Sequence, residues 1–222
     1  MPSPVTDELP ASSLSAAESY RLMTDLVAPR PIAWVSTCDA EGRGNLAPFS
    51  YFQAVCSHPP TIVLGIAWYP DGRMKDTLRN IFETRELVVS HVNEGLVAAA
   101  VATSVAYEHG ISEWERAGVA AAPSSEVRPA RVAEAVSSME CVLRHAIPLG
   151  AGPAGTPSST LVVAEVVHFA IAEGLLHRDP RGRLQPIDPA RLGAVGRMGG
   201  IAYTTTDSRL EIPRPSVPGE KP

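Results

Sequence analysis

Three short segments of the sequence gather hydroxyl, amide and ammonium groups of the kind that bind a phosphate. In Val35-Ser36-Thr37 two hydroxyls end an apolar run. In Asn45-Leu46-Ala47 the backbone N–H groups are followed by the hydroxyl of Ser50. In Lys75-Asp76-Thr77 a cation and a hydroxyl stand at the start of an expected helix, where unpaired N–H groups and the helix dipole favour an anion. The residue types therefore indicate a phosphate cradle.

Such a cradle must supply several bonds at once. Each charge-assisted hydrogen bond contributes about 1.5–3 kcal/mol, whereas micromolar retention requires about 8 kcal/mol. Any one of the segments alone is more typical of an ordinary turn, bend or capped helix. We interpret their combination as a cradle for a phosphate with a flat aromatic group beside it, as in flavin mononucleotide (FMN).

The elements that must position these segments are mainly strands. The composition of residues 32–37 predicts a strand and that of 39–44 a turn, so we expect 45–55 to return antiparallel, with an interruption or an edge at Pro48. Leu78, Ile81 and Phe82 recur at helical spacing and predict a helix over 75–85, which Asp76 or Thr77 can cap.

The rest of the chain continues this alternation of strands and turns with occasional helices. Further strands are expected at 61–67, 87–92, 137–147, 160–171 and 201–205, helices at 95–106 and 112–117, and an extended link at 129–132. A parallel doubly wound sheet would need strand–helix alternation throughout, so the pattern favours an antiparallel barrel with helical decoration. We expect one domain over 15–210, between flexible tails at 1–14 and 211–222 that are rich in proline and polar residues.

Composition argues against several classes of partner. The net charge of −5 and the absence of a basic stripe disfavour nucleic acid. No apolar run reaches the about 20 residues of a membrane helix, and no signal peptide is visible, so we expect a cytoplasmic protein with no membrane contact. Cys38, Cys56 and Cys141 lack metal-like spacing; no metal site is expected, and each is interpreted as a packed, free thiol.

The sequence resembles the flavin reductase-like family, whose members share the FMN-binding split-barrel fold. The matching segments follow the family's order and lie at residues 30–37, 45–52, 75–81, 86–90 and 196–203, within a match from about 19 to about 205. The resemblance implies a mainly β fold, an antiparallel Greek-key split β-barrel with inserted helices.

The resemblance also implies FMN held non-covalently near a homodimer interface. Its phosphate would contact Ser36, Thr37, Ser50, Lys75 and Thr77, with Asp76 in the same segment, and its ring would lie along Asn45, Leu46 and Ala47. Phe52, Trp34 and Tyr203 are candidates for packing against the ring or a substrate, and Arg197 for closing over it. Trp34 is as readily explained as a core aromatic.

The activity implied is that of an FMN-dependent oxidoreductase that accepts hydride from NADH or NADPH and passes electrons to free flavin or a small organic acceptor. Two alternatives stay open: a split-barrel flavoenzyme dedicated to one biosynthetic step, and a non-enzymatic flavin electron carrier. No Gly-x-Gly-x-x-Gly follows a strand, so a nicotinamide would have to stack transiently over the flavin. His91 is the histidine expected nearest the site, and residues 95–127 are interpreted as a cap over the substrate pocket.

Overall fold

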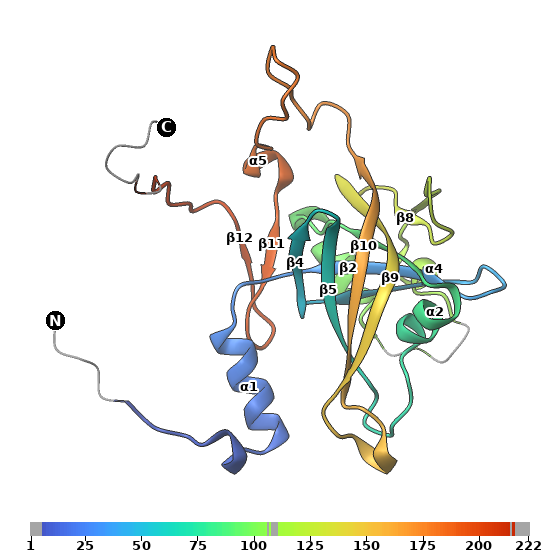
Figure 1. Ribbon diagram of the computed structural model, residues 1–222, viewed down its shortest axis with the longest axis vertical. Coiled ribbons are helices and arrows are strands. Elements are labelled where there is room, and N and C mark those ends of the chain that lie inside the picture. The colour runs from blue at the N-terminus through green and yellow to red at the C-terminus, as the bar shows by residue number, and fades with distance from the viewer. Residues whose placement is uncertain (1–5, 106, 108–110, 214, 216–222) are drawn as a thin grey trace.

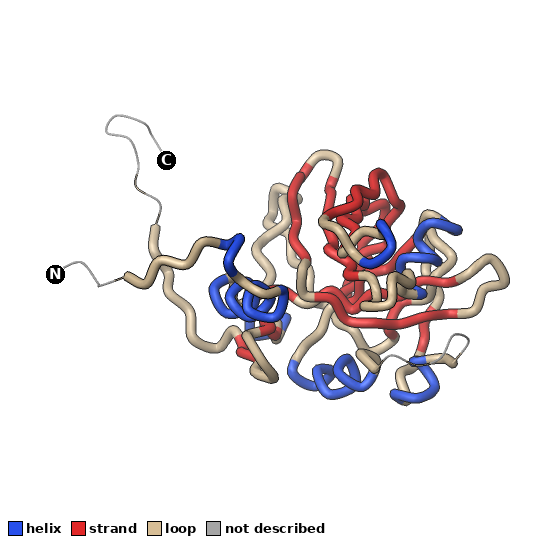
Figure 2. Tube along the Cα trace, turned by 90° about the horizontal axis from the view of Figure 1, so that it is seen from below, coloured by secondary structure: helices blue, strands red, loops and turns tan. Residues whose placement is uncertain are grey.

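The computed structural model describes residues 6–105, 107, 111–213 and 215. A seven-stranded sheet forms the body, and helix α1 stands to one side of it with a three-stranded sheet, as Figure 1 and Figure 2 show. The helices are α1 (Ala16–Leu26), α2 (Asp76–Thr84), α3 (Val97–Ala102), α4 (Glu113–Ala117) and α5 (Pro189–Leu192). The strands are β1 (Arg30–Pro31), β2 (Ala33–Cys38), β3 (Gly44–Phe49), β4 (Phe52–Ser57), β5 (Pro60–Ala67), β6 (Glu86–Ser90), β7 (Ala121–Ala122), β8 (Arg131–Val132), β9 (Ser137–Leu149), β10 (Ser159–Ile171), β11 (Val195–Arg197) and β12 (Tyr203–Thr205).

The large sheet closes on itself because of a two-residue link. Its order is β3-β2-β6-β9-β10-β5-β4 and every neighbouring pair is antiparallel. The consecutive strands β3 and β4 therefore lie at opposite edges, although only Ser50 and Tyr51 separate them. Such a link reaches at most about 11 Å, so the sheet must curl until its edges meet at this corner. The result is the predicted antiparallel barrel.

The predicted single return over 45–55 is wrong beyond Phe49. Up to that residue β3 pairs with β2 as expected, with Phe49 opposite Ala33. After the Ser50–Tyr51 corner, β4 pairs with β5 instead. Pro48 lies on the outer strand of the sheet, where its missing N–H leaves no ladder bond unmade.

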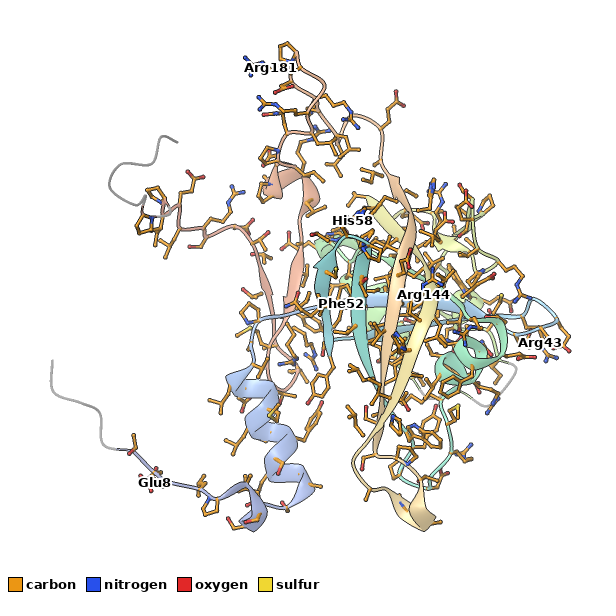
Figure 3. The ribbon with its side chains drawn as sticks, in the orientation of Figure 1. Glu8, Arg43, Phe52, His58, Arg144 and Arg181 are labelled. Atoms are coloured by element: carbon orange, nitrogen blue, oxygen red, sulfur yellow. The ribbon has the colours of Figure 1, made fainter. Side chains whose placement is uncertain are left out.

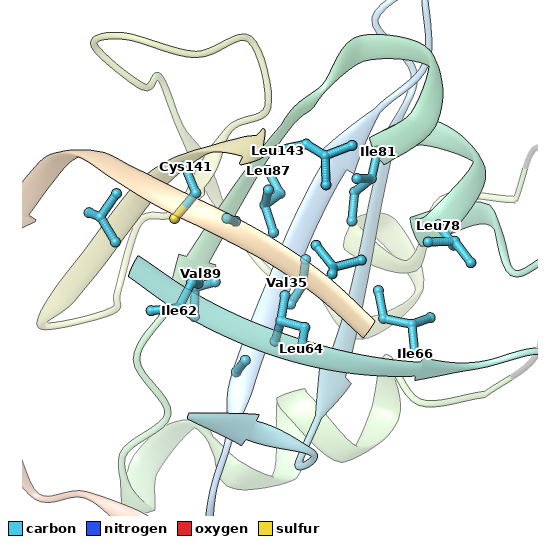
Figure 4. Close-up of a cluster of buried hydrophobic side chains, with 14 residues drawn as sticks. Val35, Ile62, Leu64, Ile66, Leu78, Ile81, Leu87, Val89, Cys141 and Leu143 are labelled. Carbon is cyan, nitrogen blue, oxygen red and sulfur yellow. The ribbon is translucent and has the colours of Figure 1, made fainter. Parts of the chain in front are cut away.

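The barrel interior is filled by aliphatic side chains from several strands and from α2. Alternate residues of β2 face opposite sides, and Ala33 and Val35 join the interior cluster with Leu78 and Ile81 of α2 (Figure 4). The predicted helix is thus confirmed, but its predicted cap is wrong. Lys75 is the N-cap residue and no side chain makes a capping bond, because Asp76 pairs with Arg79 and the Thr77 hydroxyl contacts β3.

The opposite face of β2 carries a second buried cluster, over which α3 and α4 pack. Trp34 is fully buried there with Leu46 and Trp114, and its Nε1 donates to Thr103 Oγ1 at 2.9 Å. Trp34 is therefore a core aromatic. The predicted helices at 95–106 and 112–117 correspond to α3, preceded by a short 3-10 turn, and to α4, while 106 and 108–110 lie outside the described residues.

Helix α1 and the β1–β11–β12 sheet are joined to the barrel through Arg30. Arg30 is 5% exposed, and its guanidinium donates to the carbonyls of Thr24 (2.5 Å), Val27 (2.7 Å) and Met198 (3.0 Å), while Nε donates to Ser50 Oγ (3.3 Å). Helix α1 was not expected from the sequence. Figure 1 shows it to one side of the barrel.

The other expected strands appear as β5, β6, β9, β10 and β12, and the 129–132 link contains β8. Of the three cysteines, Cys38 and Cys141 are buried as expected, but Cys56 is exposed on β4, so its predicted packing is wrong. Within the predicted tails, residues 11–13 form a short 3-10 helix, and residues 1–5, 214 and 216–222 lie outside the described residues. None of the helices in the described part of the chain is both long enough and apolar enough to span a bilayer.

Candidate functional site

A cavity of about 180 Å³, here the Lys75 cavity, opens beside strand β3. It brings together five of the predicted site residues: Asn45, Ala47, Lys75, Asp76 and Thr77. The floor is the edge strand β3, and the start of α2 forms one wall. Of the residues predicted to contact the phosphate, Lys75 and Thr77 line this cavity, whereas Ser36, Thr37 and Ser50 do not.

Lys75 is the cation of this cavity. It is half-buried, and burial lowers the pKa of its ammonium below the usual value. Among the residues that the structure describes, no carboxylate forms an ion pair with it; its Nζ lies 5.5 Å from the centre of the Tyr69 ring. The neighbouring Arg73 also lies over Tyr69 but is paired with Asp71 at 2.6 Å. Among the described residues, Lys75 therefore offers this cavity a positive charge that no ion pair neutralises.

Polar side chains tie β3 to the first turns of α2. The Asn45 amide and Thr77 Oγ1 lie 2.9 Å apart, and Asn80 Nδ2 donates to Thr37 Oγ1 at 3.1 Å. Both hydroxyls are buried, so they fix the position of the α2 N-terminus. The backbone N–H groups of the first helical turn have no intrahelical partner and favour an anion there.

Glu113 of α4 is a site residue that the sequence analysis missed. Its Oε2 accepts a hydrogen bond from the Leu46 N–H at 3.2 Å, and its Oε1 lies 3.3 Å from the Asn45 amide nitrogen in the orientation that satisfies both amide atoms. Burial raises the pKa of this carboxyl, with a further rise from the charge of Asp76. The carboxylate of Glu113 therefore accepts a hydrogen bond from the outward-facing N–H of Leu46, which lies on the strand where the flavin ring is expected.

A second cavity of about 260 Å³, the Arg197 cavity, continues from the first. The two share Pro48, Phe49 and Ser104, so they form one groove along β3. Ser50 and Arg197, both predicted, line the second cavity together with Tyr20 and Tyr203. The Arg197 guanidinium lies 4.6 Å from the centre of the Tyr203 ring and donates to the carbonyls of Ala202 (3.1 Å) and Gly200.

The structure does not bring every predicted residue to this groove. Ser36 and Thr37 are neighbours on β2, so their hydroxyls face opposite sides, and the Ser36 hydroxyl donates to the Ala130 carbonyl. The Leu46 side chain is buried in the outer cluster, so that residue offers its backbone alone. Phe52 packs against the interior cluster from β4 (Figure 3). None of these four side chains lines either cavity.

His91 lies away from the groove. Its Nε2 lies 3.1 Å from the Leu192 carbonyl, which holds α5 against the end of β6, and burial lowers the pKa of the imidazole. The role that we would assign it from the structure is to anchor α5. Of the 95–127 segment, Thr103, Ser104, Val105, Tyr107 and Glu113 line the Lys75 cavity. That this segment caps a substrate pocket stays a prediction.

Comparison with known proteins places this chain in a flavin-related family. The family model for the flavin reductase like domain matches residues 26–187. Nitrilotriacetate monooxygenase component B from Bacillus cereus is 34% identical, with a TM-score of 0.86 over 95% of this chain and 100% of that one.

Two further solved structures agree. The 2-nitrobenzoate 2-nitroreductase of Pseudomonas fluorescens is 29% identical, with a TM-score of 0.81 over 95% of this chain and 97% of that one. A Shewanella frigidimarina protein whose name records a split barrel domain is 22% identical, with a TM-score of 0.75 over 92% of this chain and 96% of that one, and shows the fold. The chain therefore belongs to the flavin reductase-like family and has its split-barrel fold.

Proposed function

We propose that this protein is an FMN-dependent oxidoreductase that accepts hydride from NADH or NADPH. The observation that carries the proposal is Lys75, a half-buried cation with no carboxylate partner among the described residues, at the start of α2 and in a cavity that continues into an aromatic-lined one. A bound phosphate would neutralise this charge at the end of the helix that favours anions.

The residues of the groove fit a flavin mononucleotide. The Lys75 ammonium and the N–H groups of the first α2 turn would hold the phosphate, and Asn45 would fix the helix start through Thr77. Pro48 and Phe49 form the shared floor on which a ring would lie, with Tyr203 and Arg197 beyond it. Two cavities that share a wall reach the range of about 300–1,000 Å³ typical of small-molecule sites.

FMN, when bound, supplies the redox chemistry, because its ring accepts a hydride and passes electrons on. The chain's own part is to bind and orient it. Lys75 would anchor one end, Tyr20 and Tyr203 would flank the other, and the edge of β3 would orient the ring between them. No protein nucleophile is required by this arrangement.

The electron acceptor that we propose is a small organic molecule or free flavin. One structural relative is named as a 2-nitrobenzoate 2-nitroreductase, and this name supports a small organic acceptor. A dedicated biosynthetic flavoenzyme and an electron carrier are the alternatives.

We further propose that two copies associate through α1. Tyr20, Met23 and Leu26 on this helix and Val27 at its C-cap are 53–79% exposed, and unpartnered apolar surface of this kind marks interfaces. Tyr20 also lines the Arg197 cavity, so association would bring a second chain close to the ring end of the groove.

An anaerobic titration tests the function. The purified protein, reconstituted with FMN, is mixed with NADH or NADPH while the flavin absorbance is followed. Rapid bleaching by a nicotinamide, followed by recolouring on addition of 2-nitrobenzoate or free flavin, supports the oxidoreductase. Bleaching by neither nicotinamide, with reduction by dithionite intact, would favour the carrier. A protein that does not retain FMN would overturn the proposal.

A further inference from the structure

A third cavity continues the groove past Lys75, at the end opposite to Arg197. This acidic cavity has a volume of about 310 Å³ and lies between the β2–β3 hairpin, α2 and α4. It shares Asn45, Asp76 and Glu113 with the Lys75 cavity. Figure 3 shows Arg43 at the outer end of the hairpin, beyond the barrel.

The charges around this cavity are mostly negative. Asp39 is paired with Arg43 at 2.6 Å and Asp76 with Arg79 at 2.8 Å. Glu113 and Glu115 also line the cavity, and among the described residues neither forms an ion pair. A second phosphate entering here would therefore meet carboxylates that no cation offsets.

Glu113 stands at the junction of the two cavities. Its carboxyl lines both of them and is held in place by the Leu46 N–H at 3.2 Å. A ligand anchored by a phosphate at Lys75 must pass this side chain to extend into the acidic cavity. FAD is such a ligand, because it carries a second phosphate and an adenosine beyond the position where FMN ends.

We propose that Glu113 makes the site selective for FMN over FAD, by closing the Lys75 end of the groove with a charge that repels the pyrophosphate. The inference rests on the proposed function, since it takes the flavin phosphate to bind at Lys75. Discrimination then comes from a repulsive element against the wrong ligand rather than from an added contact to the right one. Glu113 is a specificity-determining residue with no part in hydride transfer.

Isothermal titration calorimetry of the flavin-free full-length protein with FMN and with FAD tests the proposal. The variants are E113Q, which removes the charge and keeps the shape, and E113A, which removes both. E134Q is the matched control, because Glu134 is exposed and lines none of the cavities. Near-ultraviolet circular dichroism confirms that each variant is folded.

We expect wild type and E134Q to bind FMN at least about ten-fold more tightly than FAD, and E113Q or E113A to narrow that ratio at least about five-fold. Narrowing of the ratio in E113Q supports repulsion by the charge, whereas narrowing in E113A alone would overturn it, because side-chain volume would then discriminate between the flavins. Equal affinities in wild type, or an unchanged ratio in both variants, would overturn the inference. Wild-type protein that binds neither flavin would overturn the proposed function itself.

Discussion

The Asn45 amide and the Thr77 hydroxyl, 2.9 Å apart, join the outer strand of the barrel to the first turn of α2. Because Lys75 immediately precedes that turn, this contact sets where its ammonium stands relative to the floor of the groove. A strand edge, a helix start and a cation are thus fixed together by side chains that lie 32 residues apart in the chain.

Replacing Lys75 by Met should weaken FMN binding by about 10- to 150-fold, since a charge-assisted hydrogen bond contributes about 1.5–3 kcal/mol. Arg73→Met is the matched control: Arg73 is a cation over the same Tyr69 ring, but it is paired with Asp71 and does not line the cavity. Calorimetric affinities for FMN measure the difference. Equal losses in both variants would show that general positive charge, and not Lys75, holds the phosphate.

The pKa of Lys75 should rise when FMN binds. Burial holds it below the usual value in the free protein, and a phosphate beside it would favour the charged form. The sequence has two lysines, Lys75 and Lys221, so reductive methylation with labelled formaldehyde gives few carbon resonances to titrate by NMR. FMN affinity should fall as the pH rises through the Lys75 pKa of the free protein. A Lys75 pKa that FMN leaves unchanged would contradict a contact with the phosphate.

The carboxyl group of Glu113 should give FMN affinity a second dependence on pH, beside that of the Lys75 ammonium. Burial raises its pKa in the free protein, so the carboxyl is neutral at low pH and becomes charged as the pH rises through that value. Besides Asn45 and the Leu46 N–H, the groups around it are the Lys75 ammonium, the Tyr69 phenol, and the carboxylates of Asp76 and Glu115.

Once ionised, Glu113 repels the phosphate, so the ratio of wild-type to E113Q dissociation constants should increase with pH and then level off. Taking the ratio cancels the titration of the FMN phosphate and of Lys75. Calorimetry at intervals between pH 5 and 9 measures it. A ratio that stays constant over this range would show that the Glu113 charge does not reach the bound phosphate.

The sequence was informative where a local pattern of apolar residues decides the secondary structure. Helical spacing of Leu78 and Ile81 predicted α2, and the apolar run before Thr37 predicted β2. It was misleading for Ser36, whose hydroxyl was assigned to the same cradle as that of Thr37. Because successive side chains of a strand face opposite sides, the hydroxyls of Ser36 and Thr37 cannot both point into one cradle. Spacing alone could have raised this objection.

Other features depend on contacts between distant segments. The switch from β3 to β4 across the barrel follows from closure of the whole sheet, since nothing local distinguishes Ser50–Tyr51 from a bend within one strand. Glu113 reaches Leu46 from 67 residues away, and a carboxylate is the residue type least expected beside a phosphate site. Glu113 can be identified as a site residue only from the folded structure, in which α4 packs on β3.

Mutating the exposed face of α1 should separate the proposed dimer. M23E combined with L26E places charges on side chains that are 54% and 79% exposed, so the folded monomer has little reason to be destabilised. We expect a monomer by light scattering where wild type is a dimer. The control is L184E, which changes a side chain that is also 54% exposed but lies outside α1. This variant should stay dimeric. Wild type that is monomeric and retains FMN would overturn the dimer proposal.

Arg30→Met should destabilise the protein through the loss of one buried guanidinium. The carbonyls of Thr24, Val27 and Met198 would lose their donor, at a cost of about 2–4 kcal/mol. For a chain of this length, that corresponds to a fall in Tm of about 5–15 °C. Arg21→Met on the exposed side of α1 is the control and should change Tm little.

Because Arg30 also donates to Ser50, its loss should reach the groove as well as the fold. Ser50 lines the Arg197 cavity, and without this bond its hydroxyl loses the contact that ties the corner between β3 and β4 to Arg30. Hydrogen exchange read by mass spectrometry should therefore show faster exchange in peptides covering α1, residues 48–52 and β11 in R30M, with the interior strands β6 and β9 unchanged. Faster exchange confined to α1 would show that Arg30 anchors the helix without supporting the site.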